Sequence, residues 1–288
     1  MIDDFSEDKS ILYIEKFQKE DERIKIIKHS KNKGTLISRN EGIFLSKGKY
    51  IFIPDIDDIL SINILNHSII KITEKKSDFI IFNTYLGNKK ILMFNQIKIF
   101  KDKKIFQHQF PSFIFLGDTQ KTIIDPILRN KLFKKEVLIK ALNSINDFFL
   151  IQNMIFYEDT LLNFMIYKVY DSFFFFKKIG YFYIPNKKSL TRNYVDNQTS
   201  INRFLYSFFI FLKFILHYTK NDKYEKSIIN LILLKEMKSL LSNHIFKKLN
   251  NNLNFYINIL DLCLKNKFIS SRIKKKLIII KQLLNKII

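Results

Sequence analysis

Helical and strand-like patterns alternate along the first part of the chain, and this alternation limits the folds that the chain can adopt. Apolar residues at helical spacing predict helices over 10–22, 34–48 and 64–76. Strand-like runs lie at 23–29, 49–55 and 77–87. Helices that alternate with apolar strands are typical of an α/β fold, in which helices flank both faces of a mostly parallel sheet.

The pattern changes toward the C-terminus. Residues 88–195 mix helical and strand-like runs, whereas the pattern from about 201 onward is helical. We therefore expect a sheet-bearing domain over 1–195 and an α-helical C-terminal region over 196–288. The run at 204–218 resembles a membrane span, but it is shorter than the ~20 residues that a span needs, and Lys213 interrupts it. A buried or interfacial helix is the better interpretation.

The formal net charge of +22 raises the question of a polyanionic partner. The chain is dominated by residues with A/T-rich codons, so a biased genome explains its many lysines, and we do not expect nucleic acid as a partner. The acidic opening "MIDDFSEDKS" lacks the pattern of a signal peptide. The lone Cys263 fits a reducing compartment. We expect a cytoplasmic protein or one on the cytosolic face of a membrane, with peripheral membrane contact left open.

Three carboxylates crowd the end of the strand at 49–55, namely Asp55, Asp57 and Asp58. Such carboxylates repel one another unless a cation or several hydrogen-bond donors neutralise them. Mg²⁺ or Mn²⁺ commonly joins a protein carboxylate to the phosphates of a substrate. This cluster therefore favours a metal–diphosphate site, although a helix cap near Ile59 is a simpler reading of Asp57 or Asp58.

Three motifs in the same order resemble those of family 2 glycosyltransferases of the GT-A fold. The first is "IDDFSEDKS" at 2–10, where Asp4, Ser6 and Asp8 match. The second is "NKGTLISRNEG" at 32–42, and the third is the "DIDD" of 55–58. The likeness continues more weakly in "ILRNKLFKKEVL" at 127–138 and "FYEDTLLNF" at 156–164, so that it covers about 1–195.

The resemblance implies an enzyme that moves a sugar from a nucleotide-diphosphate donor to an acceptor hydroxyl with inversion. It implies a metal ion, Mn²⁺ or Mg²⁺, held by Asp57 with Asp55 or Asp58 assisting. Asp55 and Asp58 would also contact the nucleotide sugar. The acceptor, whether glycan, lipid or protein, stays open.

The same resemblance assigns four further roles. Asp4 would contact the nucleotide base, and Arg39 and Asn40 would lie beside the base or the ribose. Asp159 matches the catalytic base of the family, with Glu158 next to it. On spacing alone, Arg39 reads as a solvated helix residue, Asp4 as a turn residue, and the Glu158–Asp159 pair as the acidic start of a helix.

The start of the chain departs from the family pattern. Members begin with a strand and a helix that have no counterpart here, so we expect the domain to lack about 30 N-terminal residues. Phe5 also replaces a glycine, and Ile56 replaces a serine. The chain is then either part of a full enzyme or a degenerate, non-catalytic binding or scaffold protein. Because the acidic cluster and the Glu158–Asp159 pair are both present, we expect the enzyme.

Overall fold

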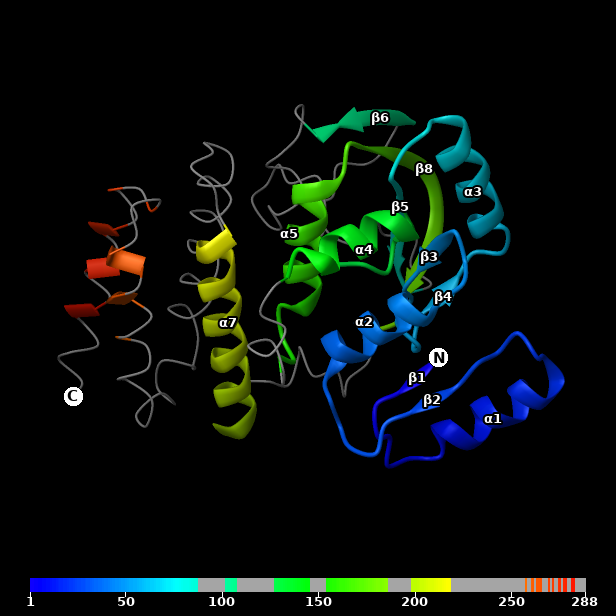
Figure 1. Ribbon diagram of the computed structural model, residues 1–288, viewed down its shortest axis with the longest axis horizontal. Helices are drawn as coiled ribbons and strands as arrows, with labels where there is room; N and C mark the ends of the chain where they lie inside the picture. Colours follow the sequence, from blue (N-terminus) through cyan, green and yellow to red (C-terminus); the bar gives the residue numbers. More distant parts are fainter. Residues whose placement is uncertain are drawn as a thin grey trace.

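The computed structural model describes residues 1–87, 102–107, 127–145, 154–185 and 198–218, together with scattered positions between 257 and 282 (Figure 1). Predictions for 88–101, 108–126 and the polar loop after 185 lie outside these residues. All three predicted helices of the first part are present. They are α1 (Ser10–Glu20), α2 (Thr35–Leu45) and α3 (Ile64–Glu74).

The strands form two sheets in the described residues. The short strands β1 (Ile2–Asp3) and β2 (Ile27–Lys28) pair in parallel with each other. The larger sheet has six strands in the order β3-β7-β5-β8-β4, with β6 also paired to β8. Its strands are β3 (Tyr50–Phe52), β4 (Ile59–Leu60), β5 (Phe79–Leu86), β6 (Lys103–Phe106), β7 (Lys131–Lys134) and β8 (Ser172–Tyr183).

The α/β fold class is confirmed, but the strand directions correct the expected mostly parallel sheet. Only the β5–β8 pairing is parallel among the described pairs of the larger sheet. The pairings β3–β7, β5–β7, β4–β8 and β6–β8 are antiparallel. The reason is that β7 comes from much later in the chain and inserts between β3 and β5. These two strands therefore run in the same direction without pairing with each other.

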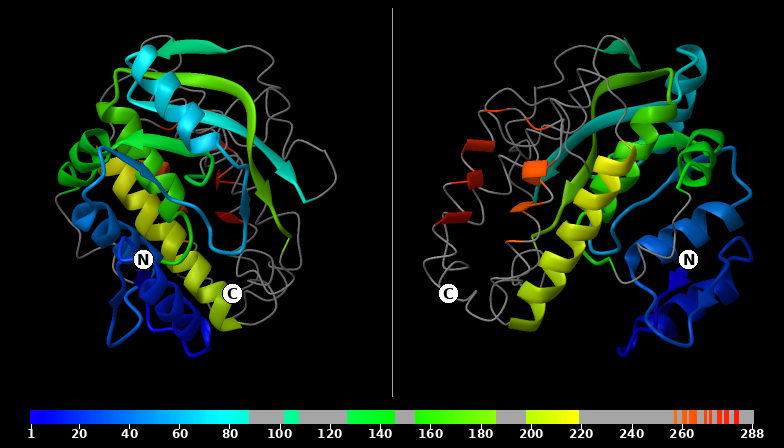
Figure 2. Two further views of the ribbon diagram at one scale, coloured as in Figure 1. Left: turned by 90° about the vertical axis from the view of Figure 1, so that its right-hand side faces the viewer. Right: turned by 60° about the vertical axis from the view of Figure 1, so that its left-hand side comes forward.

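Helices cover both faces of this sheet, as the alternation predicted (Figures 1 and 2). The four consecutive phenylalanines 173–176 form part of the buried strand β8, and their side chains alternate between the two faces. Phe173 and Phe175 join a large core with residues of α4 (Lys135–Asn143), α5 (Glu158–Val169) and α7 (Gln198–Tyr218). Phe174 and Phe176 join a smaller core that includes Ile64 of α3.

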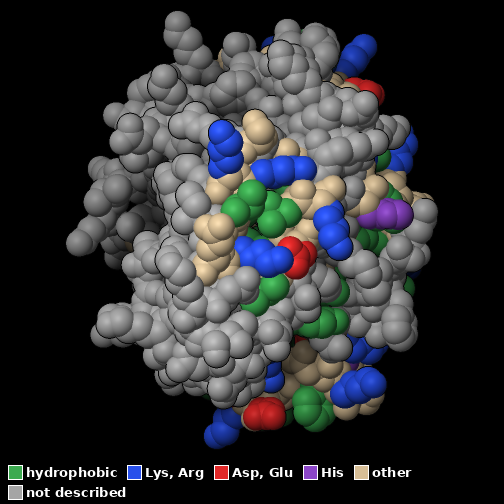
Figure 3. All heavy atoms as spheres, turned by 90° about the vertical axis from the view of Figure 1, so that its left-hand side faces the viewer, with side chains coloured by type: hydrophobic (Ala, Val, Ile, Leu, Met, Phe, Trp, Pro, Cys, Tyr) green, Lys and Arg blue, Asp and Glu red, His purple; other side chains and the backbone are tan. Residues whose placement is uncertain are grey.

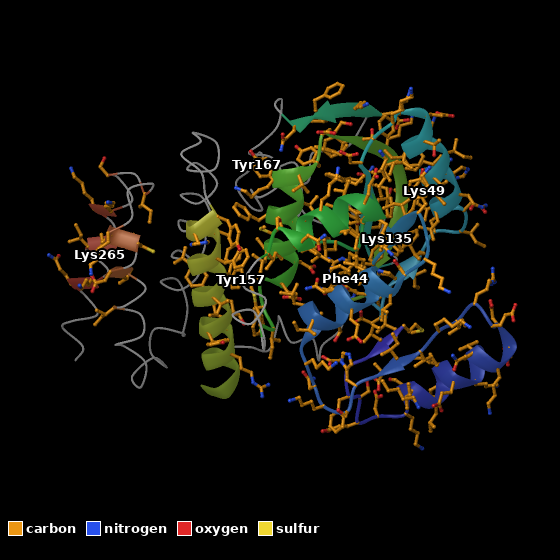
Figure 4. The ribbon with its side chains drawn as sticks, in the orientation of Figure 1. Phe44, Lys49, Lys135, Tyr157, Tyr167 and Lys265 are labelled. Atoms are coloured by element: carbon orange, nitrogen blue, oxygen red, sulfur yellow. The ribbon has the colours of Figure 1, made fainter. Side chains whose placement is uncertain are left out.

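The run at 204–218 lies within α7, which is the buried helix that the sequence predicted. Phe204, Phe208 and Phe211 are buried, and the Tyr157 ring stacks on Phe211 at 5.2 Å between centroids (Figure 4). Among the described helices, none combines the length and apolar character that a membrane crossing requires. On the face shown in Figure 3, described Lys and Arg side chains are interspersed with hydrophobic ones. The domain boundary near 195 stays a prediction.

Gly180 of β8 lies where α3 packs against the sheet, and it gives the first testable prediction. A Cβ atom at Gly180 would overlap Ile64 and would come within 2.5 Å of Phe82 Cδ2. We expect Gly180→Ala to lower the free energy of unfolding by about 1–3 kcal/mol, measured by urea denaturation, because a packed core resists added volume. Gly42→Ala is the matched control, since its Cβ would lie 3.5 Å from Ile2 within a helix. The control should be neutral or stabilise by up to about 1 kcal/mol. Equal losses in both variants would contradict the prediction.

Candidate active site

Arg39 joins two carboxylate motifs that are far apart in the sequence. It extends from α2, and only 16% of its side chain is exposed. Its Nη1 donates to Asp159 Oδ1 and, at 3.2 Å, to Glu158 Oε1. Its Nη2 lies 3.4 Å from Asp55 Oδ1. The acidic cluster that follows β3 and the acidic pair of α5 therefore meet around one guanidinium group, which makes Arg39 a buried ion-pairing residue.

Glu158 and Asp159 begin α5, where the N-terminal end of a helix favours negative charge. The residue before them, Tyr157, has a left-handed backbone conformation with φ of 67°. Leu161 and Phe164 are fully buried on the same helix and anchor it to the core. The predicted acidic helix start is therefore present, and the anchored helix fixes the direction of the two carboxylates.

The Glu158–Asp159 pair is difficult to ionise fully. Burial raises the pKa of Asp159, and Arg39 acts in the opposite direction. Burial and the neighbouring Asp159 charge raise the pKa of Glu158 to about 8. Two such close carboxyl groups titrate as a pair, and their raised pKa values favour a proton on one of them. The ionised member can then accept a proton, as a general base must.

A second arginine, Arg129, neutralises the acidic cluster from the other side. Its Nη1 donates to Asp55 Oδ2 at 3.1 Å, and its Nε lies 3.9 Å from Asp58 Oδ2. The backbone N–H of Ile184 donates to Asp58 Oδ1 at 2.7 Å. The crowding of Asp55 and Asp58 is therefore relieved by guanidinium groups and a backbone donor.

Asp57 differs from its two neighbours because it is exposed. Over the described ranges, no three His, Cys, Asp or Glu side chains gather closely enough to hold a metal ion. The three predicted metal ligands, Asp57, Asp55 and Asp58, thus do not form a closed cage. Mg²⁺ is often held by one or two carboxylates together with substrate phosphates. Binding of a metal ion by Asp57 in such an open site stays a prediction.

Asp4 fixes the turn that leads into α2. Its carboxylate accepts the backbone N–H groups of Lys33 and Gly34, each at 2.8 Å. Gly34 has a φ of 92°, a conformation that favours glycine. His29 bridges Asp4 and Glu41 with 2.7 Å contacts at its two ring nitrogens, and the Asp4 hydrogen bond raises the pKa of His29. This geometry matches the turn reading of Asp4, while its contact with a nucleotide base stays a prediction.

Asn40 lies one residue beyond Arg39 but faces a different environment. It is buried on the side of α2 that carries Leu36 and Ile43. Within the described part of the chain, neither its Oδ1 nor its Nδ2 has a hydrogen-bond partner. Its predicted place beside the base or ribose of a nucleotide is not tested by this geometry.

The sequence patterns did not point to three side chains that complete the site. The Arg129 guanidinium lies over the Tyr183 ring, 4.5 Å from its centroid. The Tyr181 hydroxyl accepts the backbone N–H of Asp55 at 3.0 Å. Charge balance was the available signal, because carboxylates at a buried strand end need cations, and Arg129 lies two residues before the buried strand β7.

Two comparisons with known sequences agree with these motifs. Residues 1–142 match the family described as glycosyl transferase family 2. Glycosyltransferase GlyG of Streptococcus pneumoniae serotype 4 (strain ATCC BAA-334 / TIGR4) is 36% identical over 86 residues. That match covers 30% of this chain and 28% of the relative, so it spans less than a third of the curated protein.

Solved structures of S. aureus TarS share the fold. TarS 1–349 in complex with UDP-GlcNAc matches with a TM-score of 0.62 at 15% identity, over 90% of this chain and 70% of that one. The same fragment with UDP gives 0.62 at 13% identity, over 99% of this chain and 77% of that one. At these identities the likeness establishes the fold, which is the GT-A type that the motifs predicted.

The contacts of Arg39 predict a stability effect that depends on pH. We expect Arg39→Met to lower the free energy of unfolding by about 3 kcal/mol at pH 8, because it leaves buried carboxylates without a partner. The loss should be smaller at pH 5, where Glu158, whose pKa is raised to about 8 in the folded chain, holds its proton. Urea denaturation at both pH values measures it.

Arg23→Met is the control for this prediction, because Arg23 is exposed and pairs with Asp21 away from the site. Its effect should stay within about 0.5 kcal/mol at both pH values. An Arg39→Met chain as stable as the wild type, or one with the same loss at both pH values, would count against the role of Arg39.

Proposed function

Residues 1–142 belong to the family 2 glycosyltransferases, and on that premise we propose that the chain transfers a sugar from a nucleotide-diphosphate donor to an acceptor hydroxyl with inversion. The observation that carries the proposal is the Arg39 junction, which brings Asp55 of the acidic cluster next to Asp159. TarS is similar in fold and has been crystallised with UDP-GlcNAc and with UDP, which supports UDP-linked sugars as the first donors to test.

Asp159 is the proposed base. Direct displacement at the anomeric carbon needs a group that removes the proton of the attacking hydroxyl. Asp159 is held at the start of α5 by Arg39, so its direction is fixed before an acceptor arrives. Glu158 is proposed to carry the shared proton of the pair, since its pKa of about 8 keeps it protonated at neutral pH. This division leaves Asp159 ionised for proton removal.

The departing nucleotide diphosphate requires positive charge at the acidic cluster. Arg129 is placed to donate to phosphate oxygens, because guanidinium groups bind such oxygens in a bidentate way. Mn²⁺ or Mg²⁺ is the proposed cation, bound at the exposed Asp57 together with donor phosphates, with Asp55 and Asp58 as the other carboxylates of the cluster. A bound divalent cation would neutralise charge on the diphosphate as the anomeric bond breaks.

The first functional prediction concerns Asp159→Asn. The amide cannot accept the proton, so we expect release of UDP from a UDP-sugar, in the presence of an acceptor, to fall at least about 100-fold. UDP affinity should change by less than about threefold, because the base acts on the acceptor. Product formation is followed by chromatography.

Asp21→Asn is the matched control, because Asp21 is a surface residue paired with Arg23, and it should leave the rate unchanged. An Asp159→Asn chain that transfers sugar at the wild-type rate would refute the assignment of the base. A wild-type chain that binds UDP but turns over no donor would favour the non-catalytic binding protein instead.

The second functional prediction concerns the cation. We expect Mn²⁺ or Mg²⁺ to increase UDP affinity at least about tenfold, and Asp57→Asn to remove this increase, because a cation joins carboxylate to phosphate. Calorimetric titration of UDP with and without the metal measures both effects. Asp21→Asn serves as the control, since Asp21 pairs with the exposed Arg23 away from the site. Equal UDP affinity in excess EDTA and in Mn²⁺ would overturn the metal dependence.

A further inference from the structure

Both oxygens of Asp55 accept from a guanidinium group. Arg39 Nη2 lies 3.4 Å from Oδ1, and Arg129 Nη1 lies 3.1 Å from Oδ2. These arginines come from different parts of the fold, since Arg39 is in α2 and Arg129 precedes β7. A carboxylate that is paired on both oxygens is a poor metal ligand until one of its partners moves away.

Arg129 is held in this position from several sides. Only 11% of its side chain is exposed, and its guanidinium stacks over Tyr183 at 4.5 Å, with the Tyr181 ring centroid 6.0 Å away. Its Nε also faces Asp58 Oδ2 at 3.9 Å. Asp58 is in turn fixed by the Ile184 N–H. The positive charge therefore sits between two of the three carboxylates of the cluster.

We propose that Arg39 and Arg129 are built-in counter-ions that compete with a divalent cation for the acidic cluster, so that the cation binds well only together with the donor's diphosphate. This inference rests on the proposed function. A divalent cation that approaches alone meets two fixed positive charges beside Asp55, and this repulsion lowers its affinity. A diphosphate supplies new oxygens, and it gives the Arg129 guanidinium an alternative anionic partner of matching geometry.

Arg39 and Arg129 have different roles in this proposal. Arg39 also holds Glu158 and Asp159, so it stays anchored by α5 when its contact with Asp55 is weakened. The ion pairs of Arg129 with Asp55 and Asp58 lie within the acidic cluster itself, so Arg129 is the arginine that shifts from carboxylate to phosphate in this proposal. Substitution of Arg129 is therefore the sharper test.

The experiment measures Mn²⁺ binding by electron paramagnetic resonance, without nucleotide and with saturating UDP. The chains are the wild type, Arg129→Gln and Arg129→Lys. In the absence of UDP, we expect Arg129→Gln to bind Mn²⁺ about tenfold more tightly than the wild type, since one competing charge is gone. Arg129→Lys, which keeps the charge, should change the affinity by less than about threefold.

Arg23→Gln is the matched control, because it removes an exposed arginine that pairs with Asp21. It should leave Mn²⁺ affinity unchanged. Adding Asp57→Asn to Arg129→Gln should abolish the gain, which would locate the bound ion at the cluster.

The proposal is overturned if folded Arg129→Gln binds Mn²⁺ no more tightly than the wild type. It is equally overturned if the wild-type chain binds Mn²⁺ as tightly without UDP as with it, a measurement that needs no variant. UDP binding that depends on Mn²⁺ in the wild type, with no gain in Arg129→Gln, would reject the counter-ions and retain the proposed function. Absence of UDP binding under every condition would reject the proposed function itself.

Discussion

The arrangement of this molecule depends on the cost of burying carboxylates. Asp55, Asp58, Glu158 and Asp159 lie close together, and unpaired buried charges of one sign destabilise a fold strongly. Arg39 meets that cost by contacting three of the four carboxylates at once. Its position ties together α2, the segment after β3 and the start of α5, where Asp159 lies 120 residues beyond Arg39 in the sequence. The site is thus held in place by the same interaction that makes it chemically useful.

The rest of the scaffold fixes where Arg39 points. Asp4 holds the turn before α2 through the Lys33 and Gly34 N–H groups. At the other end of the helix, the Lys135 Nζ of α4 donates to the Phe44 carbonyl at 3.2 Å, and both residues lie between the two helices (Figure 4). The partner helix α5 is secured by Tyr157 against α7. Helices anchored at several points aim charged side chains more reliably than loops do.

Local pattern was sufficient for α1, α2 and α3, for β3 and β5, and for the acidic residues of the site. It was not sufficient for the strand order, because the insertion of β7 between β3 and β5 depends on contacts between segments remote in sequence. The same limit hid Arg129, whose role exists only once β7 lies beside the loop after β3. It also made Arg39 look like a solvated helix residue, since its three carboxylate partners lie far along the chain. Motif resemblance supplied the identity of the acids but not of their counter-ions.

Charge balance links the acidic cluster after β3 to the Glu158–Asp159 pair of α5. One guanidinium group cannot neutralise Asp55, Glu158 and Asp159 together, and burial and the Asp159 charge raise the pKa of Glu158 although Arg39 lowers it. Positive charge added near Asp55 leaves more of Arg39 to Glu158 and Asp159, which favours the ionised state of that pair. A divalent cation bound at the acidic cluster would therefore leave Arg39 with Glu158 and Asp159 and stabilise the ionised Asp159 that removes the acceptor proton. Arg39 would thus couple cation binding at the acidic cluster to the charge of the Glu158–Asp159 pair. The coupling is electrostatic and requires no movement of the helices that carry these residues.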